Sequence, residues 1–177
     1  AHYRDTKGIE SKRSDNPLIT KKYILDVLDM IHQGKNKSEI ELFTINVVKE
    51  MLNKSIEEIA VPKALHKGIN NYKADFAHVR GAKYANKHLK LHLSKGSKPY
   101  FVYISKVPVG FPLTDVLCFE TKEQIPVGFE IDYKTMIDKL LLKKLDSIFE
   151  SMNWGESNII CSYNERELTF QRQATLV

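Results

Sequence analysis

The sequence predicts an α-rich α+β fold in which a small antiparallel β element precedes the last long helix. Apolar residues recur at helical spacing before residue 55 and again over 133–152, with capping residues at the ends of these stretches. Between them, the runs 99–107 and 116–119 are rich in β-branched and aromatic residues and are separated by Pro and Gly. A hydrophobic fraction of 42% in 177 residues is enough for one compact domain.

Capping signals predict the helices of the first third. Asn16 and Pro17 suit an N-cap and a first helical position, and Gly34 predicts the end of this helix. Its expected apolar face consists of Leu18, Ile24, Leu25, Leu28 and Ile31. Ser38 and Glu41 have capping-box spacing and predict a second helix with the apolar residues Leu42, Ile45, Val48 and Leu52. Residues 55–58 repeat the capping signal for one turn, before an extended piece at 59–62.

The later elements follow in the same way. Asp75 is expected to cap a helix over 76–88, and Asp132 to cap the strongest helix, 133–152, which ends at residues 153–155. The apolar stripe of this last helix is Met136, Ile137, Leu140, Leu141, Leu145, Ile148 and Phe149. No internal repeat is found. The expected organisation is one domain over 1–154 and a polar C-terminal tail, 155–177, without assigned elements.

Positive charge is concentrated in one segment. Residues 63–98 carry nine Lys or Arg, four of the six His and a single acidic residue, Asp75. The segment has a net charge of +8, whereas the whole chain has +5. Aromatic and small residues such as Tyr72, Phe76 and Ala82 are interspersed among the cations. This pattern favours nucleic acid as a ligand, with a solvated Lys-rich surface as the alternative.

Recognisable catalytic motifs are missing. The sequence has no Gly-rich phosphate loop, no HExxH and no Cys or His spacing typical of a metal site; His88 and His92 lie one helical turn apart, but two surface histidines are the favoured interpretation. Cys118 and Cys161 are expected to be ordinary buried thiols in a reducing compartment. No apolar run is long enough for a membrane span and no signal-peptide h-region is seen, so an intracellular location is expected.

Phosphate binding is the better-supported chemistry. In a helix over 76–88, Arg80, Lys83 and Lys87 fall on one face. Lys73 and His78 flank the N-terminal turn, whose free N–H groups can also receive a phosphate. Lys90, Lys95 and Lys98 extend the charge beyond the helix. Contacts of this kind predict salt-sensitive binding that tolerates any sequence.

Three segments together resemble family B DNA polymerases. Residues 8–17, Gly-Ile-Glu-Ser-Lys-Arg-Ser-Asp-Asn-Pro, are similar to the strand, basic turn and helix that open the thumb domain in viral and archaeal members. Residues 76–84, Phe-Ala-His-Val-Arg-Gly-Ala-Lys-Tyr, resemble a later thumb segment. Residues 127–133, Val-Gly-Phe-Glu-Ile-Asp-Tyr, resemble the segment before the long C-terminal thumb helix. Order and spacing agree, and the resemblance spans 8–154.

The resemblance implies a thumb that grips the primer–template duplex by its phosphates, without sequence specificity and without catalysis of its own. Lys12, Arg13 and Ser14 would lie near the DNA backbone at the junction with the palm. The other implied DNA-binding residues are Lys73, His78, Arg80, Gly81, Lys83, Tyr84 and Lys87. For His78 and Tyr84 the alternative is a role in helix packing.

The catalytic motifs of the family are absent from the sequence. Residues 3–7, Tyr-Arg-Asp-Thr-Lys, match its Tyr-x-Asp-Thr-Asp turn for four positions, but Lys7 replaces the second metal-binding carboxylate. We therefore expect no catalytic residue, metal site or cofactor on this chain, and Mg²⁺ in the palm of the complete polymerase. Besides DNA, the expected partner is a palm-bearing polymerase domain or fragment, the chain being either cut from a longer polymerase or the C-terminal half of a split one.

Other hypotheses remain open. Gln173 and Leu176 have the spacing that opens clamp-binding peptides, which would make a sliding clamp a partner, although an ordinary tail is favoured. A stand-alone nucleic-acid-binding accessory protein is the main alternative function. A small metal-dependent nuclease using Asp5, Glu10 and Asp15 is a third.

Overall fold

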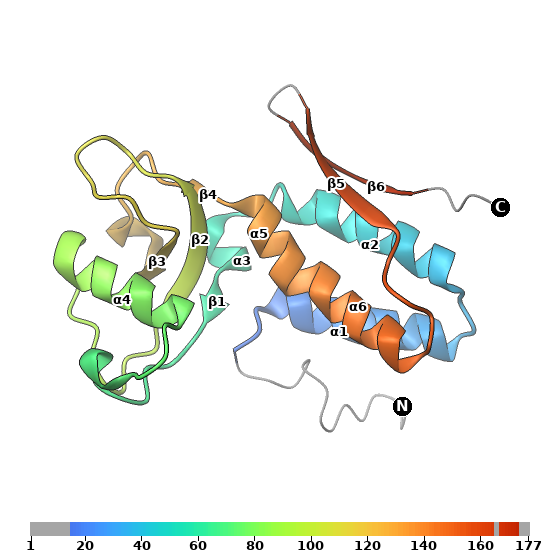
Figure 1. The fold of residues 1–177 in the computed structure, drawn as a ribbon, viewed down its shortest axis with the longest axis horizontal. Helices are drawn as coiled ribbons and strands as arrows, with labels where there is room; N and C mark the ends of the chain where they lie inside the picture. The colour runs from blue at the N-terminus through green and yellow to red at the C-terminus, as the bar shows by residue number, and fades with distance from the viewer. Residues whose placement is uncertain (1–14, 165–166, 174–177) are drawn as a thin grey trace. The chain divides into compact units, whose positions relative to one another are not determined.

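The computed structural model describes residues 15–164 and 167–173 and has the α+β fold that the sequence predicts. The described chain forms two compact units (Figure 1). Unit 1 consists of residues 18–54 and 134–173, and unit 2 of residues 15–17 and 55–133. The positively charged segment 63–98 therefore lies wholly within unit 2.

Unit 1 is a helical bundle with a β-hairpin. Its elements are α1 (Leu18–His32), α2 (Lys37–Met51), α5 (Tyr133–Ile137), a π-helical turn (Asp138–Leu142), α6 (Lys143–Ser151), β5 (Ile159–Asn164) and β6 (Glu167–Arg172). The predicted long helix over 133–152 is confirmed, since α5, the π-helical turn and α6 follow one another without a break. Six of the seven residues predicted for its apolar stripe are buried, and Ile148 is half-buried.

Helix α1 ends where Gly34 predicts, but the buried face of the helix differs from the prediction. Gly34 has a φ of +81°, and its N–H donates to the Ile31 carbonyl at 3.0 Å. The buried side chains are Thr20, Tyr23, Ile24 and Val27, whereas Leu18 is 81% exposed. Tyr23 can be buried because its hydroxyl has a partner in Thr44 Oγ1, 2.7 Å away. A partner on another helix thus decides which face turns inward.

Helix α2 has a capping box two residues before the predicted one. Asn36 is the N-cap; its side chain accepts from the Glu39 N–H, and the Glu39 carboxylate accepts from the Asn36 N–H, both at 2.9 Å. Ser38 and Glu41 have the same spacing, but Glu41 is fully buried and takes no part in capping. The predicted cap is therefore wrong, because spacing alone does not distinguish two overlapping candidates.

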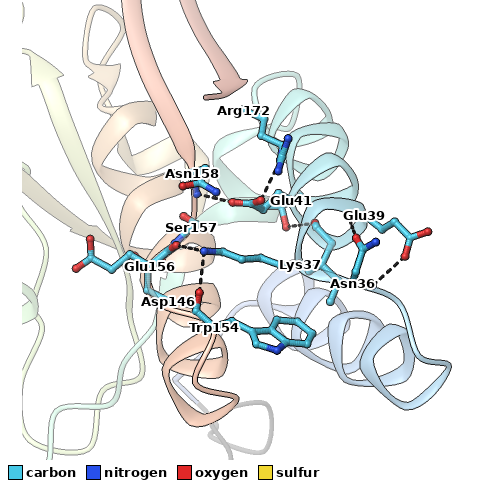
Figure 2. A network of polar contacts seen from close by, with 12 residues as sticks. Asn36, Lys37, Glu39, Glu41, Asp146, Trp154, Glu156, Ser157, Asn158 and Arg172 are labelled. Atoms are coloured by element: carbon cyan, nitrogen blue, oxygen red, sulfur yellow. Dashed lines mark hydrogen bonds and ion pairs between the residues drawn. The ribbon is translucent and has the colours of Figure 1, made fainter. Parts of the chain in front are cut away.

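The C-terminal region contains a hairpin to which the sequence analysis assigned no element. Strands β5 and β6 pair antiparallel from Ile159↔Arg172 to Asn164↔Glu167. Side chains of unit 1 hold the segment before the hairpin: Lys37 Nζ donates to the carbonyls of Trp154 and Glu156, at 2.9 and 2.5 Å (Figure 2). Asp146 accepts from the Ser157 N–H at 2.9 Å. This order comes from tertiary contacts rather than from an apolar repeat.

Unit 2 packs one helix against an antiparallel sheet. Strand β2 (Tyr100–Lys106) pairs with β1 (Val61–Pro62), with β3 (Val116–Phe119) and, near its end, with β4 (Glu130–Ile131). The predicted strands at 99–107 and 116–119 are thus confirmed, within a sheet of four strands rather than two. Helix α4 (Ala77–His88) lies on β3 and β2 and confirms the predicted helix over 76–88. The short α3 (Ile56–Ile59) has its predicted capping box between Ser55 and Glu58.

Two connections of unit 2 carry the same four residues, Pro-Val-Gly-Phe, at 108–111 and 126–129. In both, the glycine has a positive φ (+96° at Gly110, +107° at Gly128) and the valine is fully exposed. The rings of Phe111 and Phe129 contact each other at a centroid distance of 5.3 Å. The sequence analysis found no internal repeat and missed this one, which joins two loops that are distant in sequence.

Candidate nucleic-acid interface

Helix α4 carries most of the residues predicted to contact DNA. Its N-cap is Phe76, and no side-chain hydrogen bond caps the helix. The predicted cap, Asp75, instead pairs with Arg80 through Oδ2 and Nη1 at 3.2 Å. The prediction of Asp75 as a cap is therefore wrong, because the carboxylate turns toward a cation one turn into the helix.

Gly81 lies on the buried face of α4, against the sheet. A Cβ at this position would stand 3.0 Å from the Cys118 N and the Leu117 carbonyl carbon. The Cys118 thiol, which donates to the His78 carbonyl at 3.1 Å, marks the same close approach. Gly81 therefore lets α4 approach β3 closely. Because it is buried against the sheet, it has little exposed surface for the predicted contact with DNA.

Tyr84 is also held in the packing of unit 2. The residue is 9% exposed, and its hydroxyl donates to the Pro112 carbonyl at 2.6 Å. Its ring contacts His88 at 4.7 Å and Phe129 at 6.4 Å between centroids. These contacts correspond to the packing role that the sequence analysis gave as the alternative for Tyr84.

His78 is buried among aromatic rings, with 8% of its surface exposed. Burial lowers the pKa of its imidazole, and the nearby Lys63 and His66 lower it further. The ring is therefore mostly neutral near neutral pH and does not provide a positive charge for a phosphate. His78 contributes an aromatic surface, which it shares with Tyr72, Phe76 and Phe101.

The guanidinium of Arg80 is held by two carboxylates. Besides Asp75, it binds Asp115 with Nη2–Oδ2 at 2.9 Å and Nε–Oδ1 at 3.4 Å. The hydrogen bond to Asp115 is the main reason that the pKa of Arg80 is raised. Because its charge is offset twice, Arg80 fixes the start of α4 to the loop before β3 and is poorly placed as a phosphate ligand.

Lys83 and Lys87 form the exposed cationic part of α4. They lie one turn apart and form no ion pair within the described part of the chain. Both border a surface depression whose other lining residues are Gly68, Ile69, Asn70, Asn86, Leu93 and Ser94. Lys73, before the helix, is also exposed. Of the phosphate ligands predicted over 73–87, these three lysines are exposed and form no ion pair within the described residues.

Asn86 positions further cations beside this depression, and the sequence analysis missed it. Its amide donates to the Leu93 carbonyl and accepts from the Leu93 N–H, both at 2.8 Å. This pair of bonds holds the loop after α4, which carries the exposed Lys90, Lys95 and Lys98. An Asn inside a helix was the available signal, because Asn is a poor helix former.

Several predicted site residues lie outside the described residues: Lys12, Arg13, Ser14 and Leu176. Gln173 is described and exposed, and its N–H donates to the Asn158 carbonyl at 2.6 Å, next to the hairpin. For the nuclease hypothesis, Asp5 and Glu10 are also outside the described ranges, and Asp15 forms an ion pair with Lys63 at 2.8 Å. Clamp binding and the nuclease reaction therefore remain untested.

The described residues contain no group of three or more His, Cys, Asp or Glu side chains that could hold a metal ion. Both cysteines are free; Cys118 is buried as predicted, and burial raises its pKa to about 12, whereas Cys161 is only half-buried, so the prediction for it is wrong. Among the helices of the described ranges, none is long and apolar enough to cross a membrane.

What unit 2 offers is a helix-on-sheet surface with exposed lysines, which suits binding of an anion.

Comparison with known proteins gives the family. The model of DNA polymerase family B matches residues 1–152, and the chain therefore belongs to this family. A solved structure with a similar fold is the family B DNA polymerase from the hyperthermophilic archaeon Pyrobaculum calidifontis, with a TM-score of 0.56 and 17% identity. That similarity covers 73% of this chain and 17% of the archaeal one, so the chain spans a small part of that polymerase's length. No curated protein matches significantly.

Proposed function

We propose that this chain is the thumb part of a family B DNA polymerase and binds primer–template duplex through its phosphates, without sequence specificity. The proposal assigns it no catalytic role alone; nucleotide transfer and its Mg²⁺ belong to a palm-bearing domain or fragment. An intracellular location follows from this proposal. Family membership supports it, together with the order of the three thumb-like segments along the chain.

The observation that carries the proposal is the pair Lys83 and Lys87. Both are exposed on one face of α4, both border the same depression, and neither is paired within the described residues. The loop that Asn86 holds adds three more lysines. Lysines on adjacent turns can follow successive phosphates of one strand, and such contacts carry no sequence information.

Fluorescence anisotropy of a labelled primer–template duplex tests the proposal. Affinity should fall steeply with salt, and replacing Lys83 or Lys87 by Ala should weaken binding several-fold on unrelated sequences. Each replacement should also reduce the slope of log K against log salt by about one unit. Lys49→Ala removes the same charge from an exposed helical position in unit 1 and serves as the control.

A second experiment addresses the role in a polymerase. Nucleotide incorporation should require a palm-bearing family B fragment together with this chain, and the Lys83→Ala,Lys87→Ala double variant should reduce it. Duplex binding without any complementation would favour the accessory-protein alternative. Failure to bind duplex at low salt would rule out the thumb proposal. Clamp binding through Gln173 and Leu176 stays a prediction, tested by adding the clamp to a chain truncated after residue 172.

A further inference from the structure

Unit 2 has a second surface pocket that shares no lining residue with the depression beside Lys83 and Lys87. Its volume of about 390 Å³ lies in the range of about 300–1,000 Å³ typical of small-molecule sites. Aromatic side chains of Tyr72, Phe76, His78 and Phe101 line it, and Asp15 and Lys63 stand among its polar residues. The duplex contacts proposed for Lys83 and Lys87 do not use this pocket.

The aromatic rings are in mutual contact but do not stack flat on one another. Tyr72 meets Phe76 and His78 edge-on, at centroid distances of 6.1 and 5.7 Å. His78 is tilted against Phe76 at 5.6 Å and against Phe101 at 6.4 Å. Phe76 is 47% exposed although it belongs to this cluster. The rings therefore form walls, and Phe76 has exposed ring surface that a flat ligand can contact.

The charged side chains in and around the pocket indicate the charge that such a ligand should have. Lys63 is already paired with Asp15 at 2.8 Å, so the pocket itself offers neither a free cation nor a free carboxylate. Outside it, Lys67 lies over the Tyr72 ring at 5.8 Å, and Lys67 and Lys73 are exposed and unpaired within the described residues. Aromatic walls next to exposed lysines suit a planar ring attached to an anion.

Other ligand classes fit less well. A bare phosphate would make no use of the aromatic walls. A cation would have to compete with Lys63 for the carboxylate of Asp15. An apolar peptide side chain would gain nothing from the neighbouring lysines. A nucleotide matches both features, because its base has a flat π-face and its sugar carries a phosphate.

We propose that this aromatic pocket binds one unpaired base of single-stranded DNA, with the base against Phe76 and Tyr72 and the adjoining phosphates near Lys67 and Lys73. The inference rests on the proposed function in that the ligand is DNA, and it adds a site for an unpaired strand distinct from the duplex surface. Stacking on aromatic rings is tolerant of sequence, so any base is accommodated.

Binding of three labelled probes to the full chain tests the proposal: an oligothymidylate, a strand of the same length with abasic residues, and a blunt duplex. Phe76→Ala should weaken oligothymidylate binding about tenfold and leave duplex binding unchanged. Phe76→Tyr keeps a ring at the same place and should retain the affinity. Leu113→Ala, which removes an exposed apolar side chain from another loop, is the control. The abasic strand should bind the wild type no better than oligothymidylate binds Phe76→Ala.

Two outcomes would overturn the inference. The first is an unchanged affinity of Phe76→Ala for oligothymidylate. The second is that Phe76→Ala loses affinity for the abasic strand by the same factor as for oligothymidylate. Loss of duplex binding in Lys83→Ala without an effect of Phe76→Ala would leave the proposed function standing and remove the pocket. If the chain does not bind duplex but binds oligothymidylate with an affinity that depends on Phe76, the pocket would stand and the proposed function would be removed.

Discussion

The carboxylate of Glu41 on α2 accepts a hydrogen bond from Nε of Arg172 on β6 at 3.0 Å, across 131 positions of sequence (Figure 2). The Glu41 side chain is fully buried and also accepts from the Asn158 N–H. A buried carboxylate without partners is strongly unfavourable, so these two bonds are what permits Glu41 in the interior. The pair fixes the hairpin to the second helix of unit 1.

Arg172→Ala should therefore destabilise unit 1 by about 2–4 kcal/mol, because it leaves the Glu41 charge short of a partner. Urea denaturation measures the loss. The exposed ion pair of Lys143 with Asp138 is the control, and Lys143→Ala should cost at most about 1 kcal/mol. Adding Glu41→Gln to Arg172→Ala should recover part of the stability, since the double variant has no buried charge. Equal losses in Arg172→Ala and Lys143→Ala would contradict this account.

Gly81→Ala should destabilise unit 2 by about 1–3 kcal/mol, because its Cβ would meet backbone atoms of β3 at 3.0 Å. Within a helix, Gly→Ala is normally stabilising by about 1 kcal/mol, so the sign of the change is informative. Gly68→Ala is the control: its Cβ would approach only the flexible amide end of Asn71, at 3.1 Å. Thermal denaturation of both variants makes the comparison, and a stabilised Gly81→Ala would refute the close-packing role.

The repeated Pro-Val-Gly-Phe turns provide a matched pair of variants. Alanine at either glycine has to adopt a positive φ, at a cost of about 1 kcal/mol. At Gly128 the new Cβ would also stand 2.6 Å from Pro108 Cβ, whereas nothing lies within 4 Å at Gly110. Gly128→Ala should thus lose more stability than Gly110→Ala in the same denaturation assay. Similar losses of stability in the two variants would show that packing between the two loops does not contribute to stability.

The low pKa of His78 predicts a pH dependence of stability. Burial makes the folded state bind this proton less readily than the unfolded chain, whose histidine pKa is about 6.5. The contribution of neutral His78 to the free energy of unfolding should therefore be complete above about pH 6.5. The free energy of unfolding should decline as the pH falls through and below that value. Denaturant titrations across this range measure the slope, which should be shallower in His78→Gln.

The control for this experiment is His92→Gln, which removes an exposed histidine of the same segment. If His78→Gln keeps the slope of the wild type, the pH dependence arises elsewhere. The titratable groups nearest His78 are Lys63 and His66, at the start of the segment 63–98, and Asp15, which lines the same pocket and is paired with Lys63.

Most elements of the fold follow from the sequence, since periodicity and capping are local signals. The helices over 18–32 and 77–88, the long helix from 133 and the two main strands all appear where patterns predict them. The hairpin over 159–172 was missed although Leu168 and Phe170 alternate with polar residues in β6, which is a strand signal. The alternation is short, and the hairpin is held by the buried Phe170 and by contacts with α2. The cap of α2 was misplaced because two capping boxes overlap in sequence.

For the candidate site, the sequence located the concentration of positive charge but could not show which of its side chains are paired or buried. Arg80 and Lys83 are equally basic in the sequence, yet Asp115, 35 positions away, occupies the guanidinium and nothing described pairs with the lysine. In the sequence, His78 and Tyr84 are candidates for contact with DNA. In the structure both are buried in unit 2, and the Tyr84 hydroxyl is hydrogen-bonded to the Pro112 carbonyl. The aromatic pocket joins Asp15, the 61–78 stretch and Phe101, and no spacing rule brings those residues together.

The sequence by itself determined that this chain is α-rich, that one segment concentrates its positive charge, and that three of its segments resemble those of family B polymerases. These features depend on residue type and near neighbours, which a linear pattern records. Only the tertiary structure decided which charges are free, which aromatic rings form a pocket, and why Glu41 can be buried. Such properties depend on partners distant in sequence, since charge compensation and desolvation act through space.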